Sequence, residues 1–272
     1  MRKKMFRALQ KYVSDSQTLI DSFFRLDRNF VAGTYIRGSG IEIGALHNPL
    51  RIPGIARVRY LDHLPREELV RHYPELRGES IRPVDIVDDG EKLTSVSGGS
   101  QDFLIASHFL EHSEDPIGTL KNMLRVLKTG GILYLAVPDK RYTFDSDRTV
   151  TTLEHLIRDH EEGPDRSRRA HYEDWVHHVS KIADPSGAAR EVDRLLSMKY
   201  RIHFHLWTQA ELMELSLYMR KETAGIFDVE LLLKNGEEVI LVVRKNTPPA
   251  GTPAETGMSI ETDGGFAGLT PP

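Results

Sequence analysis

Acidic residues and glycines follow three short apolar runs in the first third of the chain. They are Glu42 and Gly44 after the first run, Asp62 after the second, and Asp88, Asp89 and Gly90 after the third. A carboxylate offers two acceptor oxygens, which can match the two neighbouring hydroxyls of a ribose. In dinucleotide-type folds such an acid stands about 20 residues beyond the first strand, at the tip of the second. The spacing from Glu42 to Asp62 therefore predicts a nucleoside site.

The segment S-H-F-L-E-H, residues 107–112, follows a fourth apolar run and adds a candidate base. His108 comes directly after the run, and a histidine can take a proton from a hydroxyl because its unperturbed pKa lies near neutral pH. We expect His112 to be structural. The same residues match the H-x-x-E-H pattern of zinc peptidases, in which two histidines bind the metal and Glu111 would be the base. That pattern belongs on a helix, whereas here it follows a strand-like run.

A stretch rich in histidine, charge and aromatic rings, residues 139–207, follows the fifth apolar run. We expect it to cover the substrate, because rings can stack on a ring-shaped molecule while carboxylates accept its hydroxyl protons. Asp139 is a second candidate catalytic residue. The candidate substrate-binding residues are Arg141, Tyr142, Asp145, His155 and His171.

The alternation in R-I-H-F-H-L-W, residues 201–207, predicts a strand with His203 and His205 on one face. Two such histidines could bind a divalent metal, but we expect a packed core pair and predict no metal.

The elements that must position these residues alternate between strand-like and helical patterns over residues 31–138. I-E-I-G, V-R-Y-L-D, V-D-I-V-D, D-F-L-I-A-S and I-L-Y-L-A-V have the character of strands, and a helix is predicted over 116–128. This order is typical of a parallel sheet built from βαβ units. Ligands lie at the carboxyl ends of such strands. The residues expected to share one crevice there are Gly44, Asp62, Asp89 and Ser107.

The chain divides into five predicted parts. They are N-terminal helices at 1–30, the ligand-binding core at 31–138, the insertion at 139–207, the last helix and closing hairpin of the core at 208–245, and a disordered tail at 246–272. Helices are predicted near 149–160 and 187–197 and over 209–220. Asn235-Gly236 between two alternating apolar runs indicates a hairpin. The tail is dense in Pro, Gly and Thr and has no apolar period.

These residues resemble the class I S-adenosylmethionine-dependent methyltransferases, in particular the small-molecule and sugar O-methyltransferase-like group. The resemblance covers about residues 38–140 and, more loosely, 208–245. In that family the first strand ends in acidic-x-Gly-x-Gly, which Glu42 and Gly44 match, while another residue type fills the second glycine position. The turn and fifth strand of the family resemble L-K-T-G-G-I-L-Y-L-A-V-P, residues 127–138.

The resemblance implies a Rossmann-like, doubly wound α/β fold, whose mostly parallel sheet has an antiparallel C-terminal hairpin strand and a helical insertion over the active site. It also implies an enzyme that binds S-adenosylmethionine and releases S-adenosylhomocysteine, with Asp62 at the ribose and Asp89 at the exocyclic amine of adenine. The expected cofactor-binding residues are Glu42, Gly44, Ala45, Asp62, Asp88, Asp89, Gly90 and Ser107. The expected reaction is methylation of a hydroxyl on a sugar, a glycan or another small molecule.

A second class of function stays open, a methyltransferase-like domain that binds a nucleoside or a partner without turnover, which the altered glycine turn favours. A nicotinamide oxidoreductase is disfavoured, because its pyrophosphate needs the full G-x-G-x-x-G and this turn carries Leu46, His47 and Asn48. Methylation of DNA or protein is also disfavoured, since S-H-F-L replaces the Asp/Asn-Pro-Pro-aromatic arrangement of the base-modifying relatives.

Composition suits a globular protein, with 39% hydrophobic and 28% charged residues in 272. The net charge of -4 predicts no nucleic-acid partner. Cysteine is absent, which rules out disulfides and thiolate chemistry. No apolar run suits a transmembrane helix or a secretory signal, so we expect a cytoplasmic protein. The basic start, M-R-K-K-M-F-R, allows at most peripheral contact with a membrane.

Overall fold

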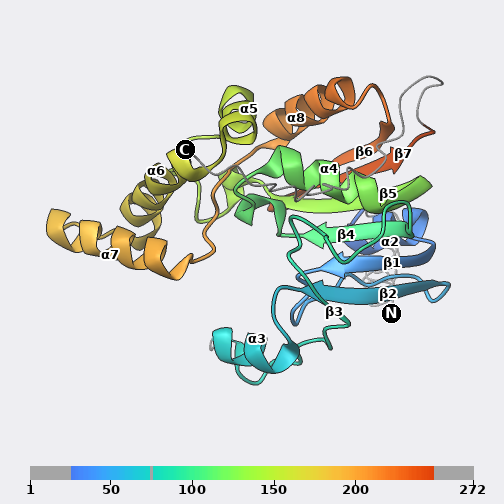
Figure 1. Ribbon diagram of the computed structural model, residues 1–272, viewed down its shortest axis with the longest axis horizontal. Helices are drawn as coiled ribbons and strands as arrows, with labels where there is room; N and C mark the ends of the chain where they lie inside the picture. The colour runs from blue at the N-terminus through green and yellow to red at the C-terminus, as the bar shows by residue number, and fades with distance from the viewer. Residues whose placement is uncertain (1–25, 74–75, 248–272) are drawn as a thin grey trace, which may run out of the picture.

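A mixed sheet organises the part of the chain that the computed structural model describes, residues 26–73 and 76–247 (Figure 1). Its strands are β1 (Gly38–Ile43), β2 (Ala56–Asp62), β3 (Ile86–Val87), β4 (Gln101–Ser107), β5 (Leu127–Pro138), β6 (Phe227–Asn235) and β7 (Glu238–Lys245). Their order is β3-β2-β1-β4-β5-β7-β6, in which the β5–β7 and β7–β6 pairs are antiparallel and the others parallel. The predicted Rossmann-like fold, with its mostly parallel sheet and C-terminal hairpin, is confirmed.

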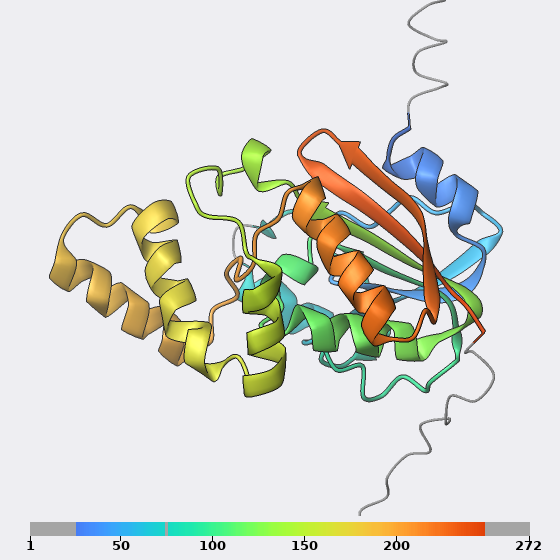
Figure 2. The same cartoon turned by 90° about the horizontal axis from the view of Figure 1, so that it is seen from above.

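The sheet is covered on both faces, as its apolar strands predict. Along β4, Phe103 and Ile105 pack into one buried cluster with α2 (Arg28–Tyr35), while Leu104 and Ala106 pack into another. The second cluster includes apolar residues of α4 (Pro116–Val126) and α8 (Gln209–Glu222). Figure 2 shows α2 and α4 on opposite sides of the sheet. Because successive strand residues point to opposite faces, a strand covered on both must be apolar nearly throughout.

Residues 139–207 form helices that lie beyond the carboxyl ends of β1, β2 and β4 (Figure 1). The elements are η3 (Lys140–Tyr142), α5 (Leu153–Glu162), α6 (Asp165–Trp175), η4 (Val176–Ser180) and α7 (Pro185–Met198). The helices predicted near 149–160 and 187–197 are confirmed as α5 and α7. The sequence does not predict α6, because this charged helix buries only Tyr172. The insertion has its own apolar cluster, to which Tyr172, Val192 and Phe204 belong.

The prediction of a strand at 201–207 is wrong. Trp207 forms a bridge to Asp139, but the preceding residues are irregular. The N–H groups of Phe204 and His205 both donate to the carbonyl oxygen of Glu111, at 2.7 and 3.3 Å. Two consecutive N–H groups point to opposite sides of a regular strand, so they can share one acceptor only where the chain bends. His203 and His205 consequently join two different side-chain clusters and do not share a face.

The remaining connections include the predicted hairpin and two short helical elements. The predicted hairpin is confirmed, since Asn235 at the end of β6 pairs with Glu238 at the start of β7, and Gly236 in the turn between them has a φ of +64°. α3 (Arg66–His72) lies between β2 and β3, and η2 (Leu110–His112) follows β4. Within the described ranges, the helices are too short or too polar to cross a membrane. The predictions for 1–25 and 248–272 fall outside the described residues.

Candidate active site

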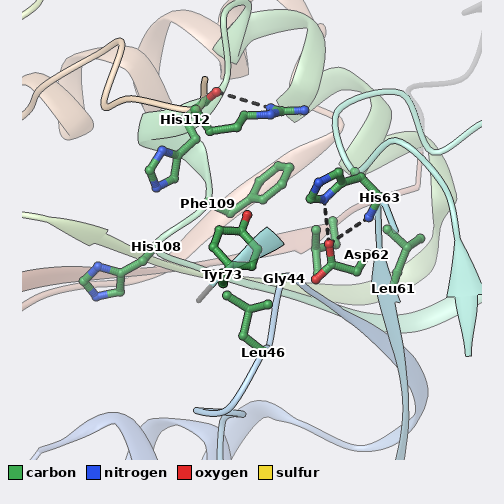
Figure 3. A pocket seen from close by; sticks show the side chains of 12 residues that line it. Gly44, Leu46, Leu61, Asp62, His63, Tyr73, His108, Phe109 and His112 are labelled. Carbon is green, nitrogen blue, oxygen red and sulfur yellow. Dashed lines mark hydrogen bonds and ion pairs between the residues drawn. The ribbon is translucent and has the colours of Figure 1, made fainter. Parts of the chain in front are cut away.

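A pocket opens at the carboxyl ends of β1, β2 and β4 (Figure 3). This is where the chain order across the sheet reverses, and such switch points bind ligands in open α/β sheets. The lining includes Gly44, Leu46, Asp62, Gly90, His108, Phe109 and His112. Gly44 and Asp62 therefore meet in one crevice, as expected. Asp89 and Ser107 lie outside the lining in the described structure.

The turn after β1 brings backbone to the pocket. Gly44 has a φ of +64°, and its N–H donates to the carbonyl oxygen of Leu61 at 3.0 Å. This left-handed conformation favours glycine, although a Cβ would have 3.8 Å of clearance from Phe109. Ala45 is buried, and its carbonyl oxygen accepts the N–H of Asn48 at 2.9 Å. Backbone hydrogen bonds, one within the turn and one to β2, therefore hold the turn at the pocket.

Glu42 lies two residues before Gly44 and is 1% exposed. Its Oε1 accepts the N–H of Leu50 at 2.7 Å, while Oε2 is buried without a hydrogen-bond partner among the described residues. Burial raises the pKa of Glu42 to about 7. The side chain fastens the far end of the turn to β1, and its contact with a cofactor stays a prediction.

Asp62 ends β2 at the edge of the pocket, beside His63 (Figure 3). Its Oδ1 accepts the backbone N–H of His63 at 2.8 Å and lies 2.7 Å from Nδ1 of the same ring. Both contacts use one oxygen, and they fix the orientation of the carboxylate. This places an acceptor where a ribose-binding acid is expected.

The loop after β3 is built by its own carboxylates. Both oxygens of Asp88 accept bonds from within the loop, including the N–H and Oγ of Ser95 at 2.8 and 2.7 Å. Asp89 accepts the N–H of Glu91 at 3.0 Å. Gly90 reaches the pocket, and a Cβ there would lie 2.8 Å from the Phe109 ring. Asp88 therefore shapes the loop, and the cofactor roles of Asp88 and Asp89 stay predictions.

His108 follows β4 with a φ of +50° and borders the pocket. Its Nε2 lies 3.0 Å from Oε2 of Glu238, the first residue of β7, and its Nδ1 lies 3.6 Å from Oε1 of Glu111. The hydrogen bond to Glu238 raises the pKa of His108. A histidine oriented by a carboxylate is the arrangement of a general base. Ser107, just before it, has a buried Oγ without a hydrogen-bond partner among the described residues.

Three ligand-type side chains that the sequence did not predict to meet lie together beside the pocket, Glu111, His112 and His203, and we name them the pocket-wall triad. Their ligand atoms lie within 4.8 Å of one another, and His112 also lines the pocket. Glu111 is 1% exposed, and neither carboxylate oxygen has a hydrogen-bond partner in the described structure. Burial raises the pKa of Glu111. Burying an unpartnered carboxylate is costly unless another group compensates it.

Both histidines of the triad are oriented from behind. Nδ1 of His112 lies 2.9 Å from the carbonyl oxygen of Ile202, and Nδ1 of His203 lies 2.7 Å from Oδ2 of Asp145. These bonds leave Nε2 of each ring as the nitrogen available to the triad. Metal-ligating histidines are typically held in this way by a carbonyl or carboxylate on the other nitrogen. Three ligands beside a pocket fit a divalent cation that keeps an open position.

The zinc-peptidase arrangement does not form. It requires both histidines of H-x-x-E-H on one helix, whereas residues 108–112 pass from the end of β4 into the 3-10 turn η2. His108 turns to Glu238, and His203 takes its place beside Glu111 and His112. The sequence pattern did identify two residues of the triad, but it could not supply the third, which lies about 90 residues further along.

Asp139 and the predicted substrate-binding residues take part in separate groups of contacts. Asp139 is buried, and Arg141 binds both of its oxygens, at 2.9 and 2.6 Å. The ring of Tyr142 lies 4.0 Å from the amino group of Lys234. Asp145 supports His203, and His155 with His171 belongs to another cluster. Their contacts with substrate, and catalysis by Asp139, stay predictions.

Comparison with known proteins assigns the chain to a family. The methyltransferase domain matches residues 71–215. Among solved structures, the chain resembles the CurJ carbon methyltransferase at 13% identity and a TM-score of 0.40, covering 78% of this chain and 50% of that one. A putative S-adenosyl-L-methionine-dependent methyltransferase of Methanococcus maripaludis shows 14% identity and a TM-score of 0.39, covering 81% and 85%.

A possible histamine N-methyltransferase of Thermotoga maritima shows 18% identity and a TM-score of 0.41, covering 89% of this chain and 100% of that one. The chain spans half the length of the CurJ structure. No curated protein matches its sequence. The family match runs from the end of α3 into α8 and includes β4, β5 and the insertion, more than half of the chain. The chain therefore belongs to the methyltransferase domain family.

Proposed function

We propose that the chain is an S-adenosylmethionine-dependent O-methyltransferase that acts on a hydroxyl of a sugar, a glycan or another small molecule. The observation that carries the proposal is the buried Glu111 carboxylate, which lies within 4.8 Å of the ligand nitrogens of two oriented histidines on the wall of a pocket at the strand ends. A hydroxyl must lose its proton to attack a methyl group, and a cation held by this pocket wall would make that proton easier to remove.

The pocket suits a nucleoside cofactor. Asp62 presents a fixed carboxylate, Gly44 presents backbone, and Phe109 presents an apolar ring. Such a mixture of apolar surface and a few oriented polar groups is typical of small-molecule sites. When bound, S-adenosylmethionine supplies a methyl group on a positively charged sulfur. Gly44, Asp62 and Gly90 would hold it at the carboxyl ends of β1, β2 and β3.

His108 is the base in this proposal. Glu238 holds its Nε2, which leaves Nδ1 to accept the proton of the acceptor hydroxyl. The imidazolium that forms lies between the carboxylates of Glu238 and Glu111, and both stabilise it. The pocket-wall triad would hold a divalent cation, which supplies a Lewis acid that makes the hydroxyl easier to deprotonate.

Cofactor binding is tested by calorimetry with S-adenosylmethionine and S-adenosylhomocysteine. The wild type should bind both, and Asp62→Ala should lose most of the signal because it removes the ribose acceptor. Asp147→Ala is the matched control, since Asp147 is exposed on the insertion. A wild type that binds neither compound ends the proposal.

The acceptor is tested by transfer of labelled methyl groups from S-adenosylmethionine to sugars and small hydroxyl compounds, with and without EDTA. Mass spectrometry of glycans and metabolites from cells with and without the gene extends the search to one added methyl. Methylation of oxygen that EDTA abolishes supports the proposal. Cofactor binding without transfer to any acceptor favours a non-catalytic binding domain.

A further inference from the structure

A second cluster of ligand-type side chains lies within the insertion, apart from the pocket-wall triad. We name it the insertion cluster: His155 and Asp159 on α5, His171 on α6, and His205 in the segment 201–207. The four ligand atoms lie within 4.8 Å of one another. Three elements, spread over about 50 residues, therefore bring one carboxylate and three imidazoles to a single point.

The cluster is buried more deeply than a surface ion pair. The side chains of His205 and Asp159 are 0% and 4% exposed, and that of His171 is 14% exposed. His155, at 31%, is the member nearest to solvent. The cluster is thus closed on the side of the core and reachable from the side of α5.

The hydrogen bonding of these side chains is incomplete. Oδ2 of Asp159 lies 3.1 Å from Nε2 of His155, yet it is a buried oxygen without a hydrogen bond of acceptable geometry in the described structure. Nδ1 of His205 is likewise buried and unpartnered there, and its Nε2 has a 3.4 Å contact with the carbonyl oxygen of Glu114. Buried polar atoms without partners are costly, so a missing partner is implied.

The distances match those around a tetrahedral metal ion. Zn–N and Zn–O bonds of 2.0–2.1 Å place neighbouring ligand atoms about 3.4 Å apart. Nε2 of His155 lies 3.1 Å from Nε2 of His171, and Oδ2 of Asp159 lies 3.1 and 3.7 Å from Nε2 of His155 and His171. These separations scatter around the expected value.

We propose that the insertion cluster binds one divalent cation of the zinc class through His155, Asp159, His171 and His205. Four protein ligands fill a tetrahedral shell, which is the mark of a structural site. The pocket-wall triad has three ligands, so the two sites differ in kind. The cation joins α5 and α6 to the segment 201–207 and so fixes the position of His203, two residues before His205.

The protonation states agree with this assignment. Burial lowers the pKa of His205 to about 3, which keeps the ring neutral. Although burial works in the opposite direction, contacts with His155 and His171 lower the pKa of Asp159. Neutral imidazole and ionised carboxylate are the forms that bind metal.

The test is cobalt and zinc binding by the full-length chain. Protein stripped with a chelator is titrated with Co²⁺, and a tetrahedral site gives intense visible absorption bands. We expect these bands in the wild type and in His203→Ala, which breaks the pocket-wall triad alone. His171→Ala, made in the His203→Ala background so that the pocket-wall triad does not contribute, should lose the bands and bind Zn²⁺ at least about 100-fold more weakly in competition with a chelator. His177→Ala, an exposed histidine of the same insertion, is the matched control.

Asp159→Asn is a second variant for the case in which His171→Ala does not fold. It keeps the size of the side chain while removing the anionic ligand, so in the His203→Ala background it should fold and still lose tetrahedral cobalt. Tetrahedral bands or tight zinc binding that survive in the Asp159→Asn and His203→Ala double variant overturn the proposal. A wild type that binds no cation, or only one that His203→Ala removes, also overturns it and indicates a hydrogen-bonded histidine cluster.

Discussion

At the scale of single residues, we expect the substitution Glu111→Gln to affect stability and methyl transfer in opposite directions. Its carboxylate is buried without a hydrogen-bond partner among the described residues, and its ion-pair contact with Nδ1 of His108 is 3.6 Å long. Glu111→Gln therefore removes a costly charge, and the metal-free variant should be at least as stable as the wild type. Methyl transfer should nevertheless fall at least about 100-fold, because the triad loses its anionic ligand. Denaturant unfolding and methyl-transfer kinetics are the measurements.

The control for Glu111→Gln is Glu154→Gln, whose side chain is exposed on α5. It should change neither stability nor rate. Unimpaired transfer by Glu111→Gln would remove the triad from the mechanism. A large loss of stability would instead mean that the ion pair of Glu111 with His108 stabilises the metal-free protein.

Glu42 gives a prediction about pH. Its pKa is raised from 4.5 in the unfolded chain to about 7 in the fold, mainly by burial. A carboxyl with a raised pKa disfavours the folded state once it ionises, so its contribution is most favourable below pH 4.5 and is lost as pH rises to 7. Glu42→Gln has no such dependence. Its stability relative to the wild type should therefore rise by about 3 kcal/mol between pH 4.5 and 7.

Urea unfolding of wild type and Glu42→Gln at several pH values checks this. The comparison cancels the other titrating groups, which both proteins share. A stability difference that stays constant from pH 4.5 to 7 would show that Glu42 ionises in the fold without cost, for instance because Arg28 compensates it.

At the scale of elements, the close approach at Gly90 links the β3 loop to the pocket. A Cβ there would lie 2.7 Å from Cγ2 of Ile43 and 2.8 Å from Cζ of Phe109. Gly90→Ala should therefore cost about 1–3 kcal/mol of stability, as overpacking does. It should also weaken cofactor binding, because Ile43 and Phe109 line the same pocket. Thermal unfolding and calorimetry measure the two effects.

Gly33→Ala is the matched control, since a Cβ at Gly33 would meet nothing within 4 Å. This glycine lies within α2, where alanine is the better helix former, so the control should be neutral or stabilising. Unchanged stability and binding in Gly90→Ala would mean that the loop shifts freely and does not shape the pocket.

The elements of the sheet were predictable from the sequence, whereas several contacts of the site were not. A strand that is buried on both faces is apolar nearly throughout, and such a run is visible in the sequence. Asn235-Gly236 between two apolar runs likewise predicts a hairpin from local sequence alone. The location of Asp62 at the pocket was predictable because it stands at the end of a strand-like run. The strand prediction for 201–207 was wrong because the alternation of this segment matches a strand, whereas the N–H groups of Phe204 and His205 donate to the carbonyl oxygen of Glu111. That bond joins residues more than 90 positions apart, and no local pattern encodes it.

The pocket-wall triad and the insertion cluster could not be predicted from the sequence for the same reason, since their members are far apart along the chain. His155 and His171 carry polar side chains on charged helices, where a sequence pattern predicts solvent exposure or substrate contact. Their convergence with Asp159 and His205 depends on how α5, α6 and the segment 201–207 pack together. The types of the ligands were visible in the sequence, but their grouping is a property of tertiary structure.

At the scale of the whole molecule, Arg148 joins helix α6 of the insertion to the segment 201–207. Its guanidinium is almost fully buried and donates to Asp145 at 2.8 Å, to Asp174 at 2.7 Å and to the carbonyl oxygen of His203 at 2.9 Å. Asp174 belongs to α6, and Asp145 precedes α5, so one side chain spans the insertion. Removing one partner of a buried ion pair leaves the other charge uncompensated.

Arg148→Ala should therefore cost about 3–5 kcal/mol, and the loss should fall on the insertion before the sheet. Hydrogen exchange distinguishes unfolding of the insertion from unfolding of the sheet. Amides of α6 and α7 should lose protection, while amides of β4 should keep it, because the β4 side chains pack in apolar clusters separate from that of the insertion. Arg158→Ala, which breaks an exposed pair with Glu154, should change stability by less than about 0.5 kcal/mol. Equal loss of protection in α6 and β4 would show that insertion and sheet unfold as one unit, and that the pocket wall depends on both.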